Sequence, residues 1–169
     1  TGTNGCTATA SVVVSGNTTP PTAGITNNTG TTTLTCATTG ISLTATGGGT
    51  YAWSGGLGTS ADATVTTAGT YTVTVTGTNG CTATASVTIT SDTTPPPASI
   101  VPTPSDATLT CTVTSISLQA QEGTGYAWSN GASGSLISVT SPDTYTVTVT
   151  GTNGCTATAS VTITSDTTP

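Results

Sequence analysis

Apolar and polar residues alternate along most of this chain in short runs with a period of two. Between residues 70 and 76, Tyr71, Val73 and Val75 alternate with threonines. Between residues 81 and 90, cysteine, alanine, valine and isoleucine alternate with threonine and serine in the same way. Strict alternation over short runs is typical of β-strands that bury one face. The pattern therefore predicts an all-β chain.

Turn residues separate these runs, at Gly47-Gly48-Gly49, at Asn79-Gly80 and around Pro142. About seven runs fall in each 75-residue stretch of sequence, which predicts an antiparallel sandwich of immunoglobulin-like type. The largest aromatic residues fall on the inward side of the alternation, so we expect them in the core: Trp53, Trp128, Tyr71 and Tyr145.

The chain is built from repeats. The sequence of residues 70–95 recurs letter for letter at residues 144–169. Two full repeats follow from this, residues 21–95 and 96–169, and residues 1–20 match only the last quarter of a repeat. Proline-rich connectors between repeats are semi-rigid, so we expect small sandwiches arranged like beads on a string. Residues 1–20 either complete a domain of their own chain or act as a donor strand that completes a neighbouring subunit.

The five cysteines follow the repeats. Cys36 and Cys81 both fall on inward positions, as do Cys111 and Cys155, which predicts the bonds Cys36–Cys81 and Cys111–Cys155 near the tryptophans. Each bond would close a loop of about 45 residues, for a chain-entropy stabilisation of roughly 4 kcal/mol. We expect Cys6 to pair upstream or in another subunit. Persistent disulfides imply an oxidising compartment.

The charge balance excludes several partners. The chain has six acidic side chains, no lysine, arginine or histidine, and a net charge of −6. Nucleic acids and anionic lipid surfaces are bound through basic residues, so neither is expected as a partner. No apolar run approaches the roughly 20 residues that a membrane span needs. The first residues match the end of a repeat and no initiator methionine precedes them, so we expect a mature fragment of a longer protein.

No catalytic constellation is apparent. Histidine and lysine, the usual general bases, are absent, and of the acidic residues only Asp92 and Asp166 occupy matching positions in the two repeats. We therefore expect no enzyme activity, no cofactor and no metal site. Asp92 beside a connector could supply one calcium ligand, but calcium usually takes several carboxylates, so a solvated turn is the preferred interpretation.

The run GTYTVTVTGTNGCTATASVTIT, with YAWS upstream, resembles the Ig-like repeats of secreted surface proteins of Bacteroidetes, including gliding-motility adhesins and other type 9-secreted proteins. The resemblance covers both full repeats and the leading fragment, and it implies display on the cell surface. It also implies O-glycosylation at Asp-Thr-Thr sites, which places candidate sugars on Thr93 and Thr167. Asn17 and Asn27 begin formal N-glycosylation motifs.

These observations favour a structural or adhesive extracellular protein that forms a filament or stalk on a bacterial surface, with covalent glycans and with copies of itself as partners. One alternative is an array of modules that bind polysaccharide, in which Tyr51 and Trp53 stack on sugars; the alternation, however, directs both residues inward. Another alternative is a passive spacer of a secreted enzyme.

Overall fold

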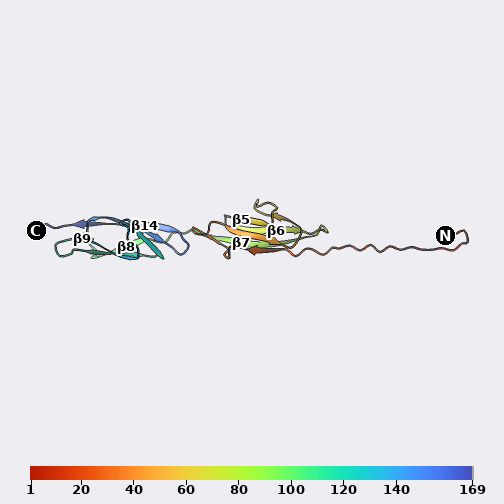
Figure 1. Ribbon diagram of the computed structural model, residues 1–169, viewed down its shortest axis with the longest axis horizontal. Coiled ribbons are helices and arrows are strands. Elements are labelled where there is room, and N and C mark those ends of the chain that lie inside the picture. Colours follow the sequence, from red (N-terminus) through yellow and green to blue (C-terminus); the bar gives the residue numbers. More distant parts are fainter. Residues whose placement is uncertain (169) are drawn as a thin grey trace. The chain divides into compact units, whose positions relative to one another are not determined.

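The computed structural model describes residues 1–168, and within them it contains strands and no α-helix, so the predicted all-β class is confirmed (Figure 1). The first repeat contributes β1 (Gly24–Asn27), β2 (Thr33–Thr35), β3 (Ile41–Thr46), β4 (Thr50–Trp53), β5 (Asp62–Val65), β6 (Gly69–Thr76) and β7 (Thr82–Asp92). The second contributes β8 (Ser99–Thr103), β9 (Thr108–Leu109), β10 (Ile116–Gln121), β11 (Gly125–Trp128), β12 (Leu136–Val139), β13 (Asp143–Thr150) and β14 (Thr156–Ser165).

The described chain forms two compact units. Among the described residues, one comprises residues 1–26, 44–63 and 71–87, and the other comprises residues 27–43, 64–70 and 88–168. The second unit therefore holds all seven strands of the second repeat together with the part of the first repeat around Cys36 and Asp92.

The second repeat is a sandwich of two sheets. Its three-stranded sheet has the order β12-β10-β8 and its four-stranded sheet has the order β11-β13-β14-β9. Most neighbours are antiparallel, with Leu118 opposite Ile137 and Tyr145 opposite Val161. The alternating apolar side chains meet between the sheets, where Ile116, Leu118 and Val147 are completely buried. Burial of these faces from water supplies the main favourable free energy of folding.

The strands of the first repeat form the same two kinds of sheet, β1-β3-β5 and β2-β7-β6-β4. The fully buried side chains again come from the inward positions, among them Ile41, Leu43 and Val73. The inner faces of the two repeats thus follow one scheme, because their sequences place apolar residues at matching positions.

Both tryptophans lie in the core, as their positions in the alternation predict. Trp53 is 7% exposed and Trp128 is 4% exposed, and Tyr71 and Tyr145 are also buried. Each indole nitrogen keeps a partner: Trp53 Nε1 donates to Ser60 O at 3.0 Å and Trp128 Nε1 donates to Gly134 O at 2.9 Å. A buried indole needs such a partner, because an unpaired N–H in the core would be costly.

One feature of the topology was not predicted from the sequence. The short strands β2 and β9 join the edge of the four-stranded sheets in parallel, with Thr35 opposite Asp92 and Leu109 opposite Ser165. The segment that follows β2 or β9 therefore emerges at the end of the sandwich where β7 or β14 finishes. This placement decides where Cys36 and Cys111 lie.

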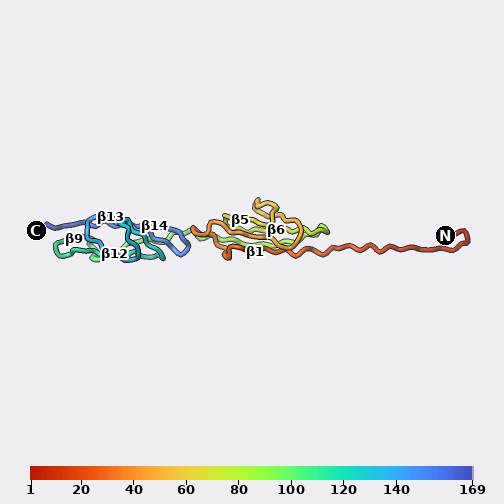
Figure 2. Tube along the Cα trace, viewed as in Figure 1, coloured from red at the N-terminus to blue at the C-terminus, as the bar shows by residue number. Residues whose placement is uncertain are grey.

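Residues 1–20 contain no strand and are exposed, apart from a short turn in which Gly5 N donates to Gly2 O at 3.0 Å. Their extended trace is drawn in red in Figure 2. Val12, Val13 and Val14 are 84%, 91% and 87% exposed. The two roles expected for this segment, as the last strand of its own chain's domain or as a donor strand, both remain predictions. No helix among residues 1–168 could cross a membrane.

Candidate interaction site at the NGC loops

A tight loop precedes the last strand of each repeat and ends in the sequence Asn-Gly-Cys; we call residues 77–81 and 151–155 the NGC loops. In residues 151–155, Gly151 N donates to Cys155 O at 2.8 Å and Gly154 N donates to Gly151 O at 3.0 Å. Gly154 has a φ of 76°, a left-handed conformation that glycine adopts without strain. The loop is thus set by local turn chemistry.

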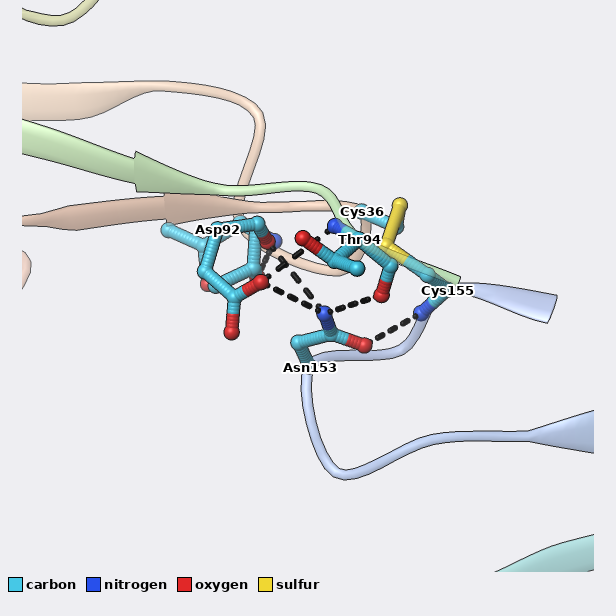
Figure 3. Close-up of a disulfide and its surroundings, with 7 residues drawn as sticks. Cys36, Asp92, Thr94, Asn153 and Cys155 are labelled. Carbon is cyan, nitrogen blue, oxygen red and sulfur yellow. Dashed lines mark hydrogen bonds between the residues drawn. A yellow bond between two sulfur atoms is a disulfide. The ribbon is translucent and has the colours of Figure 1, made fainter. Parts of the chain in front are cut away.

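The asparagine of the loop holds the connector that leads into its repeat. Asn153 Nδ2 donates to Thr94 O at 2.9 Å, to Asp92 Oδ1 at 3.1 Å and to Asp92 O at 3.4 Å (Figure 3). Its Oδ1 accepts from Cys155 N at 3.1 Å, so the same side chain shapes the loop and fixes the connector. We call this arrangement the linker contact.

The first repeat has the same linker contact. Asn79 Nδ2 donates to Thr19 O at 2.9 Å and to Asn17 O at 3.1 Å, and Asn79 Oδ1 accepts from Cys81 N at 3.1 Å. Asn17 and Thr19 stand 75 residues before Asp92 and Thr94. The sequence predicts only a turn at Asn79-Gly80, although the Thr-Thr-Pro connector that recurs after Asn17 and Asp92 offered a partner for the amide.

The disulfide of the structure joins the two repeats. Cys36 bonds to Cys155 with an S–S distance of 1.99 Å and a Cα–Cα distance of 4.9 Å, across 119 residues of sequence (Figure 3). The predicted bonds Cys36–Cys81 and Cys111–Cys155 are therefore wrong. Ala37, next to Cys36, packs against the same loop, and its N–H donates to Asn153 O at 3.3 Å.

The parallel edge strands explain the error. In the second repeat β9 pairs with the far end of β14, at Thr164 and Ser165, so Cys111 emerges there, whereas Cys155 precedes the opposite end at Thr156. The nine residue steps from Thr156 to Ser165 span about 30 Å at ~3.3 Å per residue, far beyond the reach of a disulfide. The alternation shows which face a cysteine occupies but not which end of the sandwich.

The other described cysteines are thiols. Cys6 and Cys111 are exposed, and Cys81 is partly exposed. Cys155, which has the same loop as Cys81, is only 2% exposed, because the segment around Cys36 covers it.

Acidic residues lie beside this site without forming a metal cluster. An open pocket of about 500 Å³ next to the linker contact is lined by Asp92, Thr94, Pro96, Glu122, Gly123, Thr124, Gly151, Thr152 and Asn153. No group of three or more histidine, cysteine, aspartate or glutamate side chains is placed to hold a metal in the described part of the chain. Asp92, the candidate calcium ligand, instead accepts from Asn153 and from Thr94 N at 3.3 Å.

Asp166 is the counterpart of Asp92 at the end of the second repeat. The Thr168 hydroxyl and, secondarily, the Thr168 backbone N–H donate to Asp166 Oδ1, and together they hold the pKa of that carboxyl below its usual value. Each of the two aspartates thus caps a turn of its own, in which its Oδ1 accepts from the backbone N–H of the threonine two residues later.

The candidate glycosylation residues differ in accessibility. Thr93, Thr167 and Asn17 are exposed. Asn27 is half-buried, its Nδ2 donates to Thr31 O at 2.7 Å and its Oδ1 accepts from Thr29 N at 2.9 Å. A sugar on Asn27 would replace a hydrogen of the same nitrogen that holds this turn, so Asn27 is the least suitable of the four.

Hydroxyls on the outer face of the four-stranded sheets bond to one another across strands. Thr72 pairs with Ser86 at 2.8 Å and Thr146 pairs with Ser160 at the same distance in the second repeat. Thr33 with Thr90 and Thr108 with Thr164 extend the scheme to the edge strands. Such cross-strand pairs stabilise a sheet modestly and need no charge.

Solved structures that share this fold include two from bacterial adhesins. One is a Ca²⁺-stabilised adhesin that helps an Antarctic bacterium reach out and bind ice; it has 19% sequence identity and a TM-score of 0.55, and the match covers 90% of this chain and 50% of that chain. The other comes from work on how a 1.5-MDa bacterial ice-binding adhesin is retained at the host cell surface; it has 18% identity and a TM-score of 0.52, and the match covers 90% of this chain and 67% of that chain.

At this level of identity the likeness shows the fold alone. The chain spans about half the length of the first of these structures. No protein-family model matches the sequence and no curated protein matches it, so the resemblance to Bacteroidetes repeats stays a prediction. The two structures described above both come from bacterial ice-binding adhesins.

Proposed function

We propose that this chain is a repeat segment of an extracellular structural or adhesive protein that forms a filament or stalk on a bacterial surface. The observation that carries the proposal is the Cys36–Cys155 bond, because it ties one repeat covalently to the next rather than stabilising either alone. A persistent disulfide fits an oxidising, extracellular setting. The fold shared with bacterial adhesin domains supports the same role.

The surface chemistry is consistent with a structural role. Charged residues make up only 4% of the chain, and the outward faces are threonine and serine. Hydroxyls paired across strands keep these faces polar and uncharged. We also propose that the protein carries covalent glycans, for which Thr93 and Thr167 are exposed.

The aromatic residues argue against the alternative of a polysaccharide-binding array. Sugar-binding sites usually present aromatic faces to solvent. Trp53 is buried and Tyr51, its neighbour in YAW, is half-buried. Tyr126 is also half-buried, and its hydroxyl donates to Gly123 O at 2.7 Å. No enzyme activity is proposed, and the passive spacer role differs from ours only in lacking adhesion.

The proposal is tested on cells that produce the protein, with an antibody against the repeats. Immunogold labelling and electron microscopy should place the label on material outside the cell, and brief protease treatment of intact cells should remove it. Label confined to the cytoplasm would overturn the proposal. Adhesion of these cells to surfaces, compared with cells lacking the gene, separates the adhesive role from the passive spacer.

The manner of assembly is tested by mass under reducing, denaturing conditions. A single very large chain indicates a covalent tandem array, whereas discrete small subunits indicate polymerisation through donor strands. Treatment with a deglycosylating reagent before the same measurement shows whether glycans contribute to the mass.

A further inference from the structure

We infer that Cys81 forms a disulfide with a cysteine of a repeat that precedes residue 21. We infer likewise that Cys111 forms the equivalent disulfide with a cysteine of a repeat that follows. Each bond would join the Leu-Thr-Cys cysteine of one repeat to the Asn-Gly-Cys cysteine of the next, as Cys36 is joined to Cys155. Two of the three free thiols of the structure, Cys81 and Cys111, would then take part in this series of bonds between successive repeats, which we call the disulfide relay.

The two NGC loops have the same sequence and the same backbone hydrogen bonds. Cys81 and Cys155 are each the sixth residue of the same seven-residue sequence, TGTNGCT. Gly77 N donates to Cys81 O at 2.8 Å, as Gly151 N donates to Cys155 O at 2.8 Å. The loop around Cys81 therefore already has the conformation that holds a bonded cysteine in the second repeat.

The connector that leads into each repeat is held by the loop asparagine in the same way. Asn153 fixes Asp92 and Thr94, and Thr35 of β2 pairs with that same Asp92, which brings Cys36 to Cys155. Asn79 fixes Asn17 and Thr19 by the same amide. Relative to Asn79, residues 15–17 therefore have the position that residues 90–92 have relative to Asn153. A strand equivalent to β2 that paired with residues 15–17 would place its cysteine next to Cys81.

The space beside the first NGC loop is open, whereas the corresponding space at the second loop is filled. A Cβ on Gly154 would lie 2.7 Å from Ala37 Cβ, because the segment around Cys36 covers that glycine. A Cβ on Gly80 meets nothing within 4 Å, although the φ angles of the two glycines, 79° and 76°, nearly agree. Cys81 is partly exposed where Cys155 is buried. The covering segment is therefore the one component that the first loop lacks.

The occupant we assign is a preceding repeat in the same chain, whose last strand would be residues 7–16. These residues match the sequence of β7 closely and lie exposed with unpaired valines such as Val12. A second copy of the chain is less suitable, because its own connector would have to displace Asn17 and Thr19 from Asn79.

The bond requires an oxidant, which we name as a disulfide-containing oxidoreductase or a small-molecule disulfide. The thiolate of one cysteine attacks the oxidant disulfide, forms a mixed disulfide and releases one oxidant thiol. The thiolate of the second cysteine then displaces the other oxidant sulfur. Two protein thiols become one disulfide, and the oxidant takes up two electrons and two protons as two thiols.

The test uses an extended chain in which residues 21–95 are present twice in succession, folded with oxidised and reduced glutathione. Five cysteines of the chain and two of the added repeat make seven. The relay predicts two disulfides and so three thiols that react with a thiol reagent under denaturing conditions. Five thiols would mean that Cys81 of the second copy stays reduced. One thiol would mean that the bonds form within repeats. Either result would overturn the inference.

Matched variants locate the bonds. In the extended chain, Cys36→Ser in the first copy should raise the thiol count by one, because the Cys81 thiol of the second copy loses its partner. Cys81→Ser in the first copy removes a free thiol and should lower the count by one. If each of the two variants instead raised the thiol count by one, Cys36 and Cys81 of the first copy would be bonded to each other. Covalent dimers on a non-reducing gel would assign the bond to a second chain and contradict the tandem occupant.

Far-UV circular dichroism of each variant shows whether it keeps the β-sheet signal, and the unmodified chain serves as reference with three free thiols and one disulfide. None of these counts depends on whether the protein is adhesive, so failure of the relay and failure of the proposed function are distinguished.

Discussion

At the scale of single residues, a few polar side chains fix the connectors. Asn153 and Asn79 each donate from one amide to two residues of the preceding connector and accept from the cysteine of their own loop. A side chain of this type can do so because its amide supplies two donors and an acceptor at once. The disulfide then adds a covalent tie at the same place.

Removing the Asn153 side chain should weaken the linker contact. We expect Asn153→Ala to lower the free energy of unfolding by about 1–2 kcal/mol, since several partly solvated hydrogen bonds are lost together. The control is Asn130→Ala, because Asn130 Oδ1 accepts only from Ala132 N at 3.1 Å. Chemical denaturation followed by circular dichroism measures both, and equal losses in the two variants would contradict the role assigned to Asn153.

The carboxyl of Asp166 should titrate below its usual range. The Thr168 hydroxyl is the main cause, so Thr168→Val should raise the pKa of Asp166 toward the model-peptide value. Because the pKa of Asp166 is lower in the folded state than in the unfolded state, the ionised carboxylate stabilises this turn at pH values above the unfolded-state pKa. This stabilisation is lost as the pH falls through the folded-state pKa. NMR titration of the side-chain carboxyl measures the shift, and an unchanged pKa in Thr168→Val would refute this cause.

At the scale of strands and sheets, the alternation was a reliable guide. It predicted about seven strands per repeat and the inward position of Trp53 and Trp128, and the structure has both. The parallel pairing of β2 and β9 was not predicted. β2 has three residues and β9 has two, and strands this short show no periodicity in the sequence. That omission alone misplaced Cys36 and Cys111, and with them the disulfides.

The linker contact and the inter-repeat bond could not be predicted for a related reason. Parity along a strand is local, whereas the position of Cys36 depends on which strand its segment joins and in which direction. The repeat itself held part of the signal, since Asn17 and Asp92 precede the same Thr-Thr-Pro sequence.

The core of the second repeat depends on Trp128 at the end of β11. We expect Trp128→Ala to lower the free energy of unfolding by about 3–5 kcal/mol, because it leaves a cavity between the sheets. Trp128→Phe should cost less, since the ring is mostly kept and only the bond to Gly134 O and some packing are lost. Tryptophan emission in the unmodified chain should be blue-shifted and poorly quenched by acrylamide; a red-shifted, readily quenched emission would contradict the burial.

At the scale of the whole molecule, stability arises without side-chain ion pairs. The chain has six acidic residues and no lysine, arginine or histidine. Folding must therefore depend on burial of the apolar faces, backbone hydrogen bonds, hydroxyl pairs and the disulfide. A surface of this kind, presented again by each repeat, suits a protein whose proposed role is length rather than recognition.

The melting temperature should respond to salt in one direction only. The acidic residues repel one another, and raising the ionic strength from about 0.01 to 0.15 M shortens the screening length from about 30 to 8 Å. We expect the melting temperature to stay constant or rise slightly with sodium chloride. A clear fall would indicate an attractive electrostatic interaction that this charge composition does not provide.

The central claim is that a disulfide joins successive repeats, and peptide mapping under non-reducing conditions tests it most directly. With no lysine or arginine for trypsin, the alkylated chain is cut on the amino side of aspartate, which places Cys36 in residues 1–61, Cys81 in 62–91, Cys111 in 106–142 and Cys155 in 143–165. The account predicts that residues 1–61 and 143–165 run as one disulfide-linked species that separates on reduction. Fragments 1–61 joined to 62–91, or 106–142 joined to 143–165, would contradict it.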